Sequence, residues 1–215
     1  FLFVLIMLMI GALALWVSHN TYENYAENII SDMESEAVRI DRSLIVKIKN
    51  ASYLLEALAR QVIQIGPAQK VAVADLLQSF NDAREARPRE FARISPNLDI
   101  VLSGTRAQLR HPINVSDRDY VKRALASPWE VHLGRPIQSR LLHTQVLPLS
   151  IGVSDHDGRF VGILVLMLDI AELTEALRQV LHTPGMQFAL FTDTLALISS
   201  SHPVGAEEAE TLKTP

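Results

Sequence analysis

The chain has 215 residues, with 24 acidic and 20 basic side chains and a formal net charge of −4. Acidic and basic residues are mixed along it, so no surface for nucleic acid is indicated. Cysteine is absent, which is compatible with an oxidising compartment, although many cytosolic proteins also lack it. The length is sufficient for one well-packed domain and part of another.

Residues 1–17 predict a transmembrane helix. The first sixteen carry no charge, and a bilayer core needs about 20 apolar residues in a helix. No small-residue cleavage site follows Trp16, so we expect an anchor and not a signal peptide. Because no methionine precedes Phe1, we expect the helix to begin before that residue.

The charges that follow this segment predict its orientation. Every charged residue before Arg39 is acidic, whereas cytoplasmic flanks are usually rich in Lys and Arg. We therefore expect the rest of the chain to lie outside the cytoplasm. The acidic residues are Glu23, Glu27, Asp32, Glu34 and Glu36.

Residues 18–66 predict one long stalk helix of about 70 Å, at 1.5 Å per residue. Apolar residues recur at steps of three and four, no proline or glycine interrupts 17–65, and Gly66 and Pro67 supply a stop signal. The stripe fits a helix pair in a homodimer, and it equally fits burial against the chain's own sheet. Its members are Ile30, Met33, Ala37, Ile40, Leu44, Ile48, Ala51, Leu55, Leu58, Val62 and Ile65.

Residues 67–182 predict a helix followed by a sheet. The helix covers 68–86, and the charged run 81–90 is interpreted as its exposed end and a loop. A hairpin of strands 98–103 and 107–110 turns at Gly104. Ser116 and Asp119 then form a capping pattern for a short helix that ends at Pro128.

Three further strands are predicted at 131–137, 145–153 and 159–168. Between the second and third, Asp155 to Gly158 predicts a tight turn, because Asp-Gly accepts positive φ. Residues 160–168 are apolar at almost every position, which predicts a central strand covered on both faces, with the stalk on one of them.

The last segments predict a helix and the start of a second unit. Asp169 and Glu172 form a capping pair for a helix over 170–181, and Pro184 and Gly185 break the chain. Residues 187–200 predict a hairpin that turns near 192–194. We expect 183–215 to be the beginning of a second, incomplete subdomain.

This order of elements resembles the double Cache sensor domains of bacterial membrane receptors, which have a PAS-like topology. The amino-acid sequence is most similar to that of the Cache domains that precede diguanylate cyclase modules. The resemblance implies an α+β fold in which a transmembrane helix continues into a stalk packed on an antiparallel sheet, with a membrane-distal sensor domain at 67–182. The similar stretches are 115–124, 133–136, 146–150, 155–162 and 166–169.

The resemblance also implies a function. It indicates the ligand-sensing input domain of a receptor of the diguanylate cyclase, histidine kinase or chemoreceptor type, without a cofactor. The receptor would lie in the bacterial inner membrane, with this domain in the periplasm or extracellular space. Its partner would be a small organic acid or amino acid, and the output module would lie outside these residues.

The candidate binding residues follow from the same resemblance and from the chemistry of a metabolite pocket. Such a pocket needs a guanidinium for a carboxylate, aromatic walls, and an acid for an amine. Arg118, Tyr120 and Asp169 match the family's Arg, first aromatic and terminal Asp. Val121 stands where amino-acid binders usually have a second aromatic, so a carboxylate ligand is favoured. Three more candidates lie on the facing strand and loop: Arg135, Arg140 and His143.

Each candidate also has a structural interpretation. Asp169 can simply cap the following helix, Arg118 can pair with Asp117 or Asp119 at the surface, and Tyr120 can be a core aromatic. The other three can be exposed side chains.

The sequence also bears on two further functional classes. A tethered periplasmic hydrolase is disfavoured, because the chain has no Gly-x-Ser-x-Gly, no His-Glu-x-x-His and no phosphate-binding glycine loop. No catalytic or metal-binding residue is therefore predicted. A ligand-free dimerisation or protein-interaction module remains open, and a filled apolar interior in place of a pocket would favour it.

Overall fold

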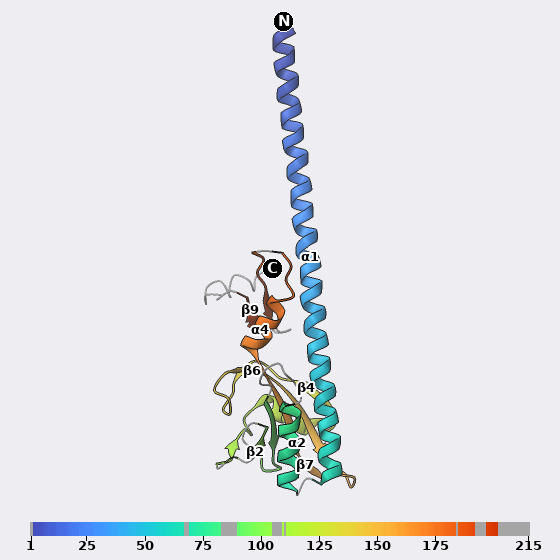
Figure 1. Cartoon of the computed structure of the whole chain (residues 1–215), viewed down its shortest axis with the longest axis vertical. Coiled ribbons are helices and arrows are strands. Elements are labelled where there is room, and N and C mark those ends of the chain that lie inside the picture. Colours follow the sequence, from blue (N-terminus) through green and yellow to red (C-terminus); the bar gives the residue numbers. More distant parts are fainter. Residues whose placement is uncertain are drawn as a thin grey trace.

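The computed structural model describes residues 2–66, 69–82, 90–104, 109, 111–183, 185–191 and 197–201, with side chains from residue 29 onward. One long helix runs the whole length of the molecule, and a sheet and a small hairpin pack beside its C-terminal half (Figure 1). This helix, α1, spans Leu2–Ile65. It ends just before Gly66, whose φ of 95° is costly for residues with a Cβ, so the predicted stop is confirmed.

The predicted membrane segment, 1–17, lies outside the residues whose side chains the structure describes. From residue 29 onward, where the structure describes side chains, no helix has an apolar stretch of sufficient length to cross a membrane.

The sheet has seven antiparallel strands in the order β3-β2-β1-β7-β6-β4, with β5 paired to β6. Strand β7 lies between β1 and β6 and is buried over most of its length, so the predicted central strand is confirmed. The turn 155–158 is confirmed too, with the Gly158 amide donating to the Asp155 carbonyl at 3.0 Å. The strands are β1 Glu90–Ile94, β2 Asp99–Ser103, β3 Ile113–Asn114, β4 Val131–Leu133, β5 Ile137–Gln138, β6 Gln145–Ser154 and β7 Phe160–Asp169.

Strand β1 corrects the sequence prediction, which ended a loop at residue 90 and placed no strand before 98. All five residues of β1 are buried, and β2 pairs with it and with β3. The predicted partner strand of β2, 107–110, falls mainly outside the described residues. The charged residues of β1 do not predict a buried strand. In the structure, however, Arg93 is buried and donates to the Val161 carbonyl at 3.4 Å. Burial lowers the pKa of Arg93 below its ordinary value.

The two faces of the sheet are covered by different elements. Helix α1, with α2 (Lys70–Asp82) and α4 (Ile170–Arg178), covers the face that carries Leu164, Leu166 and Leu168. Helix α3 (Asp119–Ala126) covers the opposite face. The stalk's covering role is therefore confirmed, because Ala51, Leu55 and other stripe residues are completely buried against the sheet.

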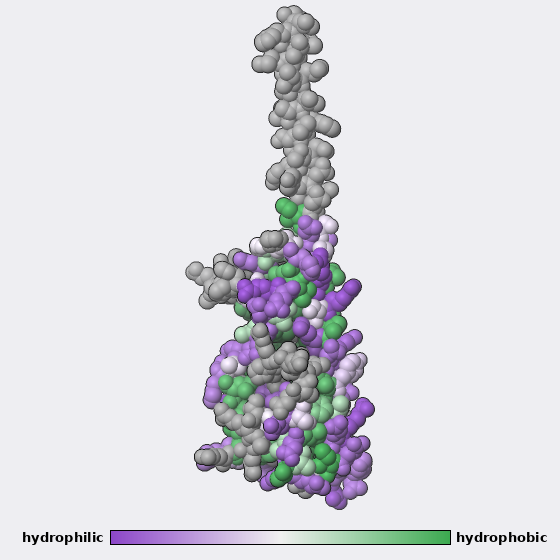
Figure 2. All heavy atoms as spheres, viewed as in Figure 1, coloured by the Kyte–Doolittle hydropathy of each residue, from purple (hydrophilic) through white to green (hydrophobic). Residues whose placement is uncertain are grey.

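The same stripe continues beyond the sheet without cover from the described residues. Ile29, Ile30 and Met33 are 55–57% exposed. Figure 2 shows apolar surface at the end of the described stalk that is farthest from the sheet. The upper stalk thus presents apolar side chains that the sheet does not cover.

Helix α4 leads from the sheet to a second, two-stranded sheet. Asp169 caps α4 as predicted, and the helix ends at Arg178, three residues earlier than the predicted end at 181. Strands β8 (Ala189–Phe191) and β9 (Leu197–Ser200) pair as the predicted hairpin, whose turn at 192–194 lies outside the described residues. A hydrogen bond between Thr174 and Ser199 joins α4 to this hairpin.

A buried carboxylate fastens the stalk to the segment after α4. Glu36 is 2% exposed, and its Oε1 accepts from the His182 amide at 3.1 Å and from Thr183 Oγ1 at 3.2 Å. Arg39 Nη1 lies 3.5 Å from the same oxygen. Burial acts to raise the pKa of Glu36, but these hydrogen bonds and the charges of Arg39 and His182 leave it lower than its ordinary value of 4.5. The contact therefore stabilises the fold above that pH and is lost as the pH falls through the lowered pKa.

Replacing Glu36 with Ala should free the His182 amide, because its acceptor is removed while the helix itself is kept. We expect several-fold faster hydrogen–deuterium exchange in the peptide that contains His182 and Thr183. Glu34→Ala is the matched control, since Glu34 lies on the same helix and is exposed. Equal exchange in both variants would show that the carboxylate does not hold this segment.

Candidate functional site

Helix α3 lies directly on β6, and small residues of the strand make this contact possible. A Cβ on Gly152 would clash with the Ala124 carbonyl oxygen. Ser150 Oγ donates to the Tyr120 carbonyl at 2.9 Å, inside the core. Gly and Ser in β6 therefore fix where α3, and the candidate residues at its start, lie on the sheet.

The start of α3 differs in detail from the predicted cap. Arg118 is the N-cap residue, and it provides no side-chain cap. Ser116 instead donates its hydroxyl to Asn114 Oδ1 at 2.7 Å, and Asp119 pairs with Arg123 at 3.1 Å. The capping prediction for Ser116 is wrong, because the turn at 116–117 directs this side chain back toward β3.

Two of the predicted arginines meet at the start of α3. Arg140 Nη1 and Nη2 each lie 2.8 Å from a carboxylate oxygen of Asp117, and Nη1 also donates to the Asn114 carbonyl at 2.7 Å. Arg118 Nη2 donates to the Gln138 carbonyl at 3.2 Å. The bidentate pair holds the loop at 139–144 against the turn before α3. It also lowers the pKa of Asp117, chiefly through the hydrogen bonds from Arg140.

Tyr120 lies beneath these charges. Its side chain is 2% exposed, and burial raises its pKa to about 12. The positive charges of Arg118 and Arg140 oppose this rise, whereas Asp117 adds to it. The structure thus brings together three of the six predicted residues, Arg118, Tyr120 and Arg140, and adds Asp117 to them.

The other three candidates make separate contacts. Arg135 is exposed just after β4, and its side chain forms no ion pair with a described residue. His143 is exposed at a positive φ of 59°, and its carbonyl accepts from Gln138 Nε2 at 2.6 Å. Asp169 Oδ1 accepts from the amides of Ala171 and Glu172 at 2.9 and 3.2 Å, which is its capping role.

The Asp169 side chain nevertheless lies on the sheet face that α3 covers. It pairs across the ladder with Val146, and side chains directly opposite in an antiparallel pair share a face. Val146 and Met167 both belong to the apolar cluster beneath α3. Asp169 therefore marks the edge of that cluster nearest to α4.

The space between α3 and the sheet holds buried apolar side chains. Tyr120, Val121 and Ala124 of α3 pack there with Leu141 of the loop and with Met167 of β7. Ser139 Oγ donates to Met167 Sδ at 3.4 Å and accepts from the amides of Leu141 and Leu142. No group of three or more His, Cys, Asp or Glu side chains suited to a metal ion occurs in the described ranges.

Sequence reasoning did not find Asp117 and Ser139 as parts of this arrangement. The partners of Asp117 and Ser139 are separated from them by 23 and 28 residues, so no local spacing reports the contacts. The sequence predicts Asp117 only as a surface partner of Arg118, whereas its ion pair in the structure is with Arg140.

Comparison with known proteins supports the fold. No protein-family model matches the chain, and no curated protein resembles it in sequence. Solved structures do match. The sensory domain of the Campylobacter jejuni chemoreceptor Tlp3, with isoleucine bound, has a TM-score of 0.64 at 16% identity, covering 89% of this chain and 75% of that one.

This chain has the fold of bacterial sensory domains. The sensor domain of the V. cholerae histidine kinase DctB gives a TM-score of 0.64 at 13% identity, covering 82% of this chain and 68% of that chain. The ligand-binding domain of the Pseudomonas fluorescens chemoreceptor CtaA, with L-alanine, gives 0.60 at 19%, covering 79% and 69%. The predicted α+β arrangement of a long N-terminal helix on an antiparallel, Cache-like sheet is therefore confirmed.

The burial of Tyr120 predicts a late ionisation step. Spectrophotometric titration of the folded chain should show one tyrosine that ionises near pH 12, and Tyr120→Phe should remove that step. Because the unfolded chain loses this proton first, the folded state should lose stability as the pH rises from about 10 toward 12. Tyr53→Phe, which alters an exposed stalk residue, should leave the late step in place.

Proposed function

We propose that this chain is the extracytoplasmic, ligand-sensing input domain of a transmembrane receptor. The observation that carries the proposal is the shared fold, since the Tlp3 and CtaA structures hold isoleucine and L-alanine and the DctB structure is a histidine kinase sensor domain. The domain itself would be non-catalytic. A cyclase, kinase or chemoreceptor output module would lie elsewhere in the receptor.

The uncharged N-terminal segment supports anchoring in a bacterial inner membrane. Residues 1–17 are the proposed anchor, and the acidic residues after them favour a periplasmic or extracellular location for 18–215. Residues 67–182 would form the membrane-distal sensor unit, and 183–215 would begin a second subdomain.

The proposed ligand is a small organic acid or amino acid, with its carboxylate at Arg118 and Arg140. Arg118 donates to a neutral carbonyl, which is a weaker acceptor than a carboxylate. Arg140 already holds Asp117 in a bidentate pair, so a ligand carboxylate would compete with Asp117 for the same guanidinium. Tyr120 would supply the aromatic wall.

The remaining candidates would contact other parts of the ligand. Asp169 lies at the edge of the same sheet face and would accept from a ligand amine, if one is present. Arg135 and His143 would contact the ligand from the strand and loop that follow α3. The competition between ligand and Asp117 would free the loop at 139–144 to move against α3.

Transmission would follow the physical contacts between the sheet and the stalk. A ligand can shift an equilibrium only by binding one of two arrangements more tightly. Here the two arrangements would differ in how β7 and α4 lie against α1, because α4 continues directly from β7 and the Glu36 contact follows it. Small sliding or rotation of α1 would carry the change toward the membrane.

Arg118→Ala should abolish the thermal shift that an active ligand produces. A screen of small organic acids and amino acids against the full chain identifies that ligand. The loss follows because removal of a guanidinium leaves a desolvated carboxylate without its main partner.

Arg123→Ala is the matched control for this experiment. Arg123 lies on the same helix, is half-exposed and pairs with Asp119. The control should shift like the parent chain, and the melting temperature of Arg118→Ala without ligand shows whether it folds. An unchanged shift in a folded Arg118→Ala protein rules out this site.

The buried apolar side chains beneath α3 favour a second candidate, a ligand-free dimerisation or protein-interaction module. Buried side chains occupy the space beneath α3. The stalk also exposes a second, outer stripe of apolar residues that faces away from the sheet, at steps of seven and one residues, and 44–64% of each residue is accessible. This outer stripe consists of Val38, Ile45, Val46 and Tyr53. A homodimer through the stalk is compatible with both candidate functions, whereas only the first requires a ligand.

A stalk dimer predicts efficient disulfide cross-linking at Ile45→Cys. The chain has no cysteine of its own, so each single variant reports one position. Two parallel helices bring equivalent stripe positions within the roughly 7 Å between Cα atoms that a disulfide spans.

Asn50→Cys is the control for this experiment, because Asn50 is exposed on the same helix but lies about 140° around the helix axis from Ile45. Non-reducing electrophoresis of the membrane-inserted chain should show dimer for Ile45→Cys and little for Asn50→Cys. Equal yields would contradict the stalk interface. Strong cross-linking with no active ligand would favour the second candidate.

A further inference from the structure

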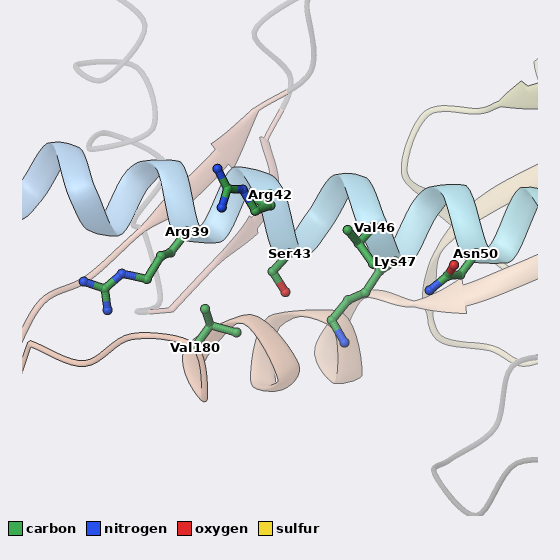
Figure 3. Close-up of a pocket in the computed structure, with 7 residues that line it drawn as sticks. All are labelled: Arg39, Arg42, Ser43, Val46, Lys47, Asn50 and Val180. Atoms are coloured by element: carbon green, nitrogen blue, oxygen red, sulfur yellow. The ribbon is translucent and has the colours of Figure 1, made fainter.

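A groove of about 490 Å³ lies between the stalk and the end of α4, away from the site under α3. Six of its lining residues come from three turns of α1, and Val180 comes from the segment just after α4 (Figure 3). The lining residues are Arg39, Arg42, Ser43, Val46, Lys47, Asn50 and Val180.

The groove is strongly basic in a chain whose net charge is −4. Three of the seven lining residues are cations and none is an anion. Within the described part of the chain, Arg42 and Lys47 form no ion pair. Arg39 lies 3.5 Å from Glu36 through Nη1, which leaves most of its five N–H donors for another acceptor. The groove thus holds unneutralised positive charge.

The cations on the α4 side are spaced along the helix. Arg39, Ser43 and Lys47 follow one another at steps of four residues, so Arg39 and Lys47 lie two turns, or about 12 Å, apart along the axis. Figure 3 shows the Arg39 and Lys47 side chains on the side of α1 that faces the α4 segment, on either side of Ser43, with Val180 below the space between Arg39 and Ser43. Arg42 points away from α4 and forms the other rim.

We propose that this groove binds an elongated organic dianion, such as a linear dicarboxylate. One acidic group would lie at Arg39 and the other at Lys47. The hydroxyl of Ser43 would donate between them, and Val46 and Val180 would contact the apolar middle of the ligand. A compact anion would meet only one of the two spaced cations.

A lipid headgroup is a poor fit for the same cations. Arg39 lies 22 residues beyond the predicted membrane segment, which ends at residue 17, and this is about 33 Å along the helix. That distance is far beyond the headgroup layer, so the ligand is a solute.

The position of the groove gives its occupant a structural effect. Val180 lies two residues before His182, whose amide donates a hydrogen bond to Glu36. Arg39 pairs with Glu36 and also lines the groove. A bound dianion would bridge α1 to the end of α4 at the place where the stalk and the following segment are already joined. It would therefore stabilise that junction independently of any ligand at Arg118.

Isothermal titration calorimetry of the full chain with adipate tests this proposal. The titrations are made at matched ionic strength in the Arg118→Ala background, so that a carboxylate site under α3 does not contribute. Adipate should bind, and valerate, which carries one carboxylate, and inorganic phosphate should bind at least about tenfold more weakly.

Lys47→Gln should weaken adipate about three- to tenfold, as expected for the loss of one partly exposed charged contact. Lys49→Gln is the matched control, because it makes the same charge change two residues away at an exposed position outside the groove. Binding that is unchanged by Lys47→Gln, equally reduced by Lys49→Gln, equal for valerate or phosphate, or absent for adipate overturns the proposal. Arg39 is left intact because its loss would also disturb Glu36.

Discussion

The burial of one face of α1 against the sheet is the contact on which the rest of the structure depends. Leu55 and Leu58 have no exposed surface, and each fully buried leucine side chain contributes about 1.5–3 kcal/mol. This cover allows β7 to be apolar on both faces, since Leu166 faces the stalk and Val165 faces α3. Without the helix, half of the central strand would be exposed to water. The sheet and the stalk are therefore one folding unit.

The sequence contained enough information for the parts of the fold that such burial dictates. The continuous apolar run at 160–168 and the stripe along the stalk both report core contacts directly. Strand β1 was missed because Glu90 and Arg93 are charged, and a charged residue normally indicates exposure. In the structure Arg93 reaches a carbonyl of β7. Because Arg93 and Val161 are 68 residues apart, no local sequence pattern reports their contact.

The candidate site likewise has a part that the sequence predicts and a part that it does not. Asp169 and Glu172 stand at capping distance, and the cap is present. By contrast, the grouping of Arg140 with Asp117 depends on how the loop at 139–144 folds back over the sheet. The two guanidinium groups, Asp117 and the buried phenol form a grouping that only the tertiary structure assembles. The residue types were predictable, but their mutual distances were not.

The helix α1 is attached over a long stretch, and this limits how it can move. Its stripe packs on the sheet from Ala51 onward, Ile40 is buried in the same apolar cluster, and Glu36 fixes the helix about 22 Å from Ala51 along the axis. A rod that is held at several points cannot swing about any one of them. Relative motion between the sheet and the segment after α4 is thereby confined to displacement along the rod or torsion about it. Of the movements open to a helix beside a sheet, the fold thus leaves sliding and twisting and excludes tilting.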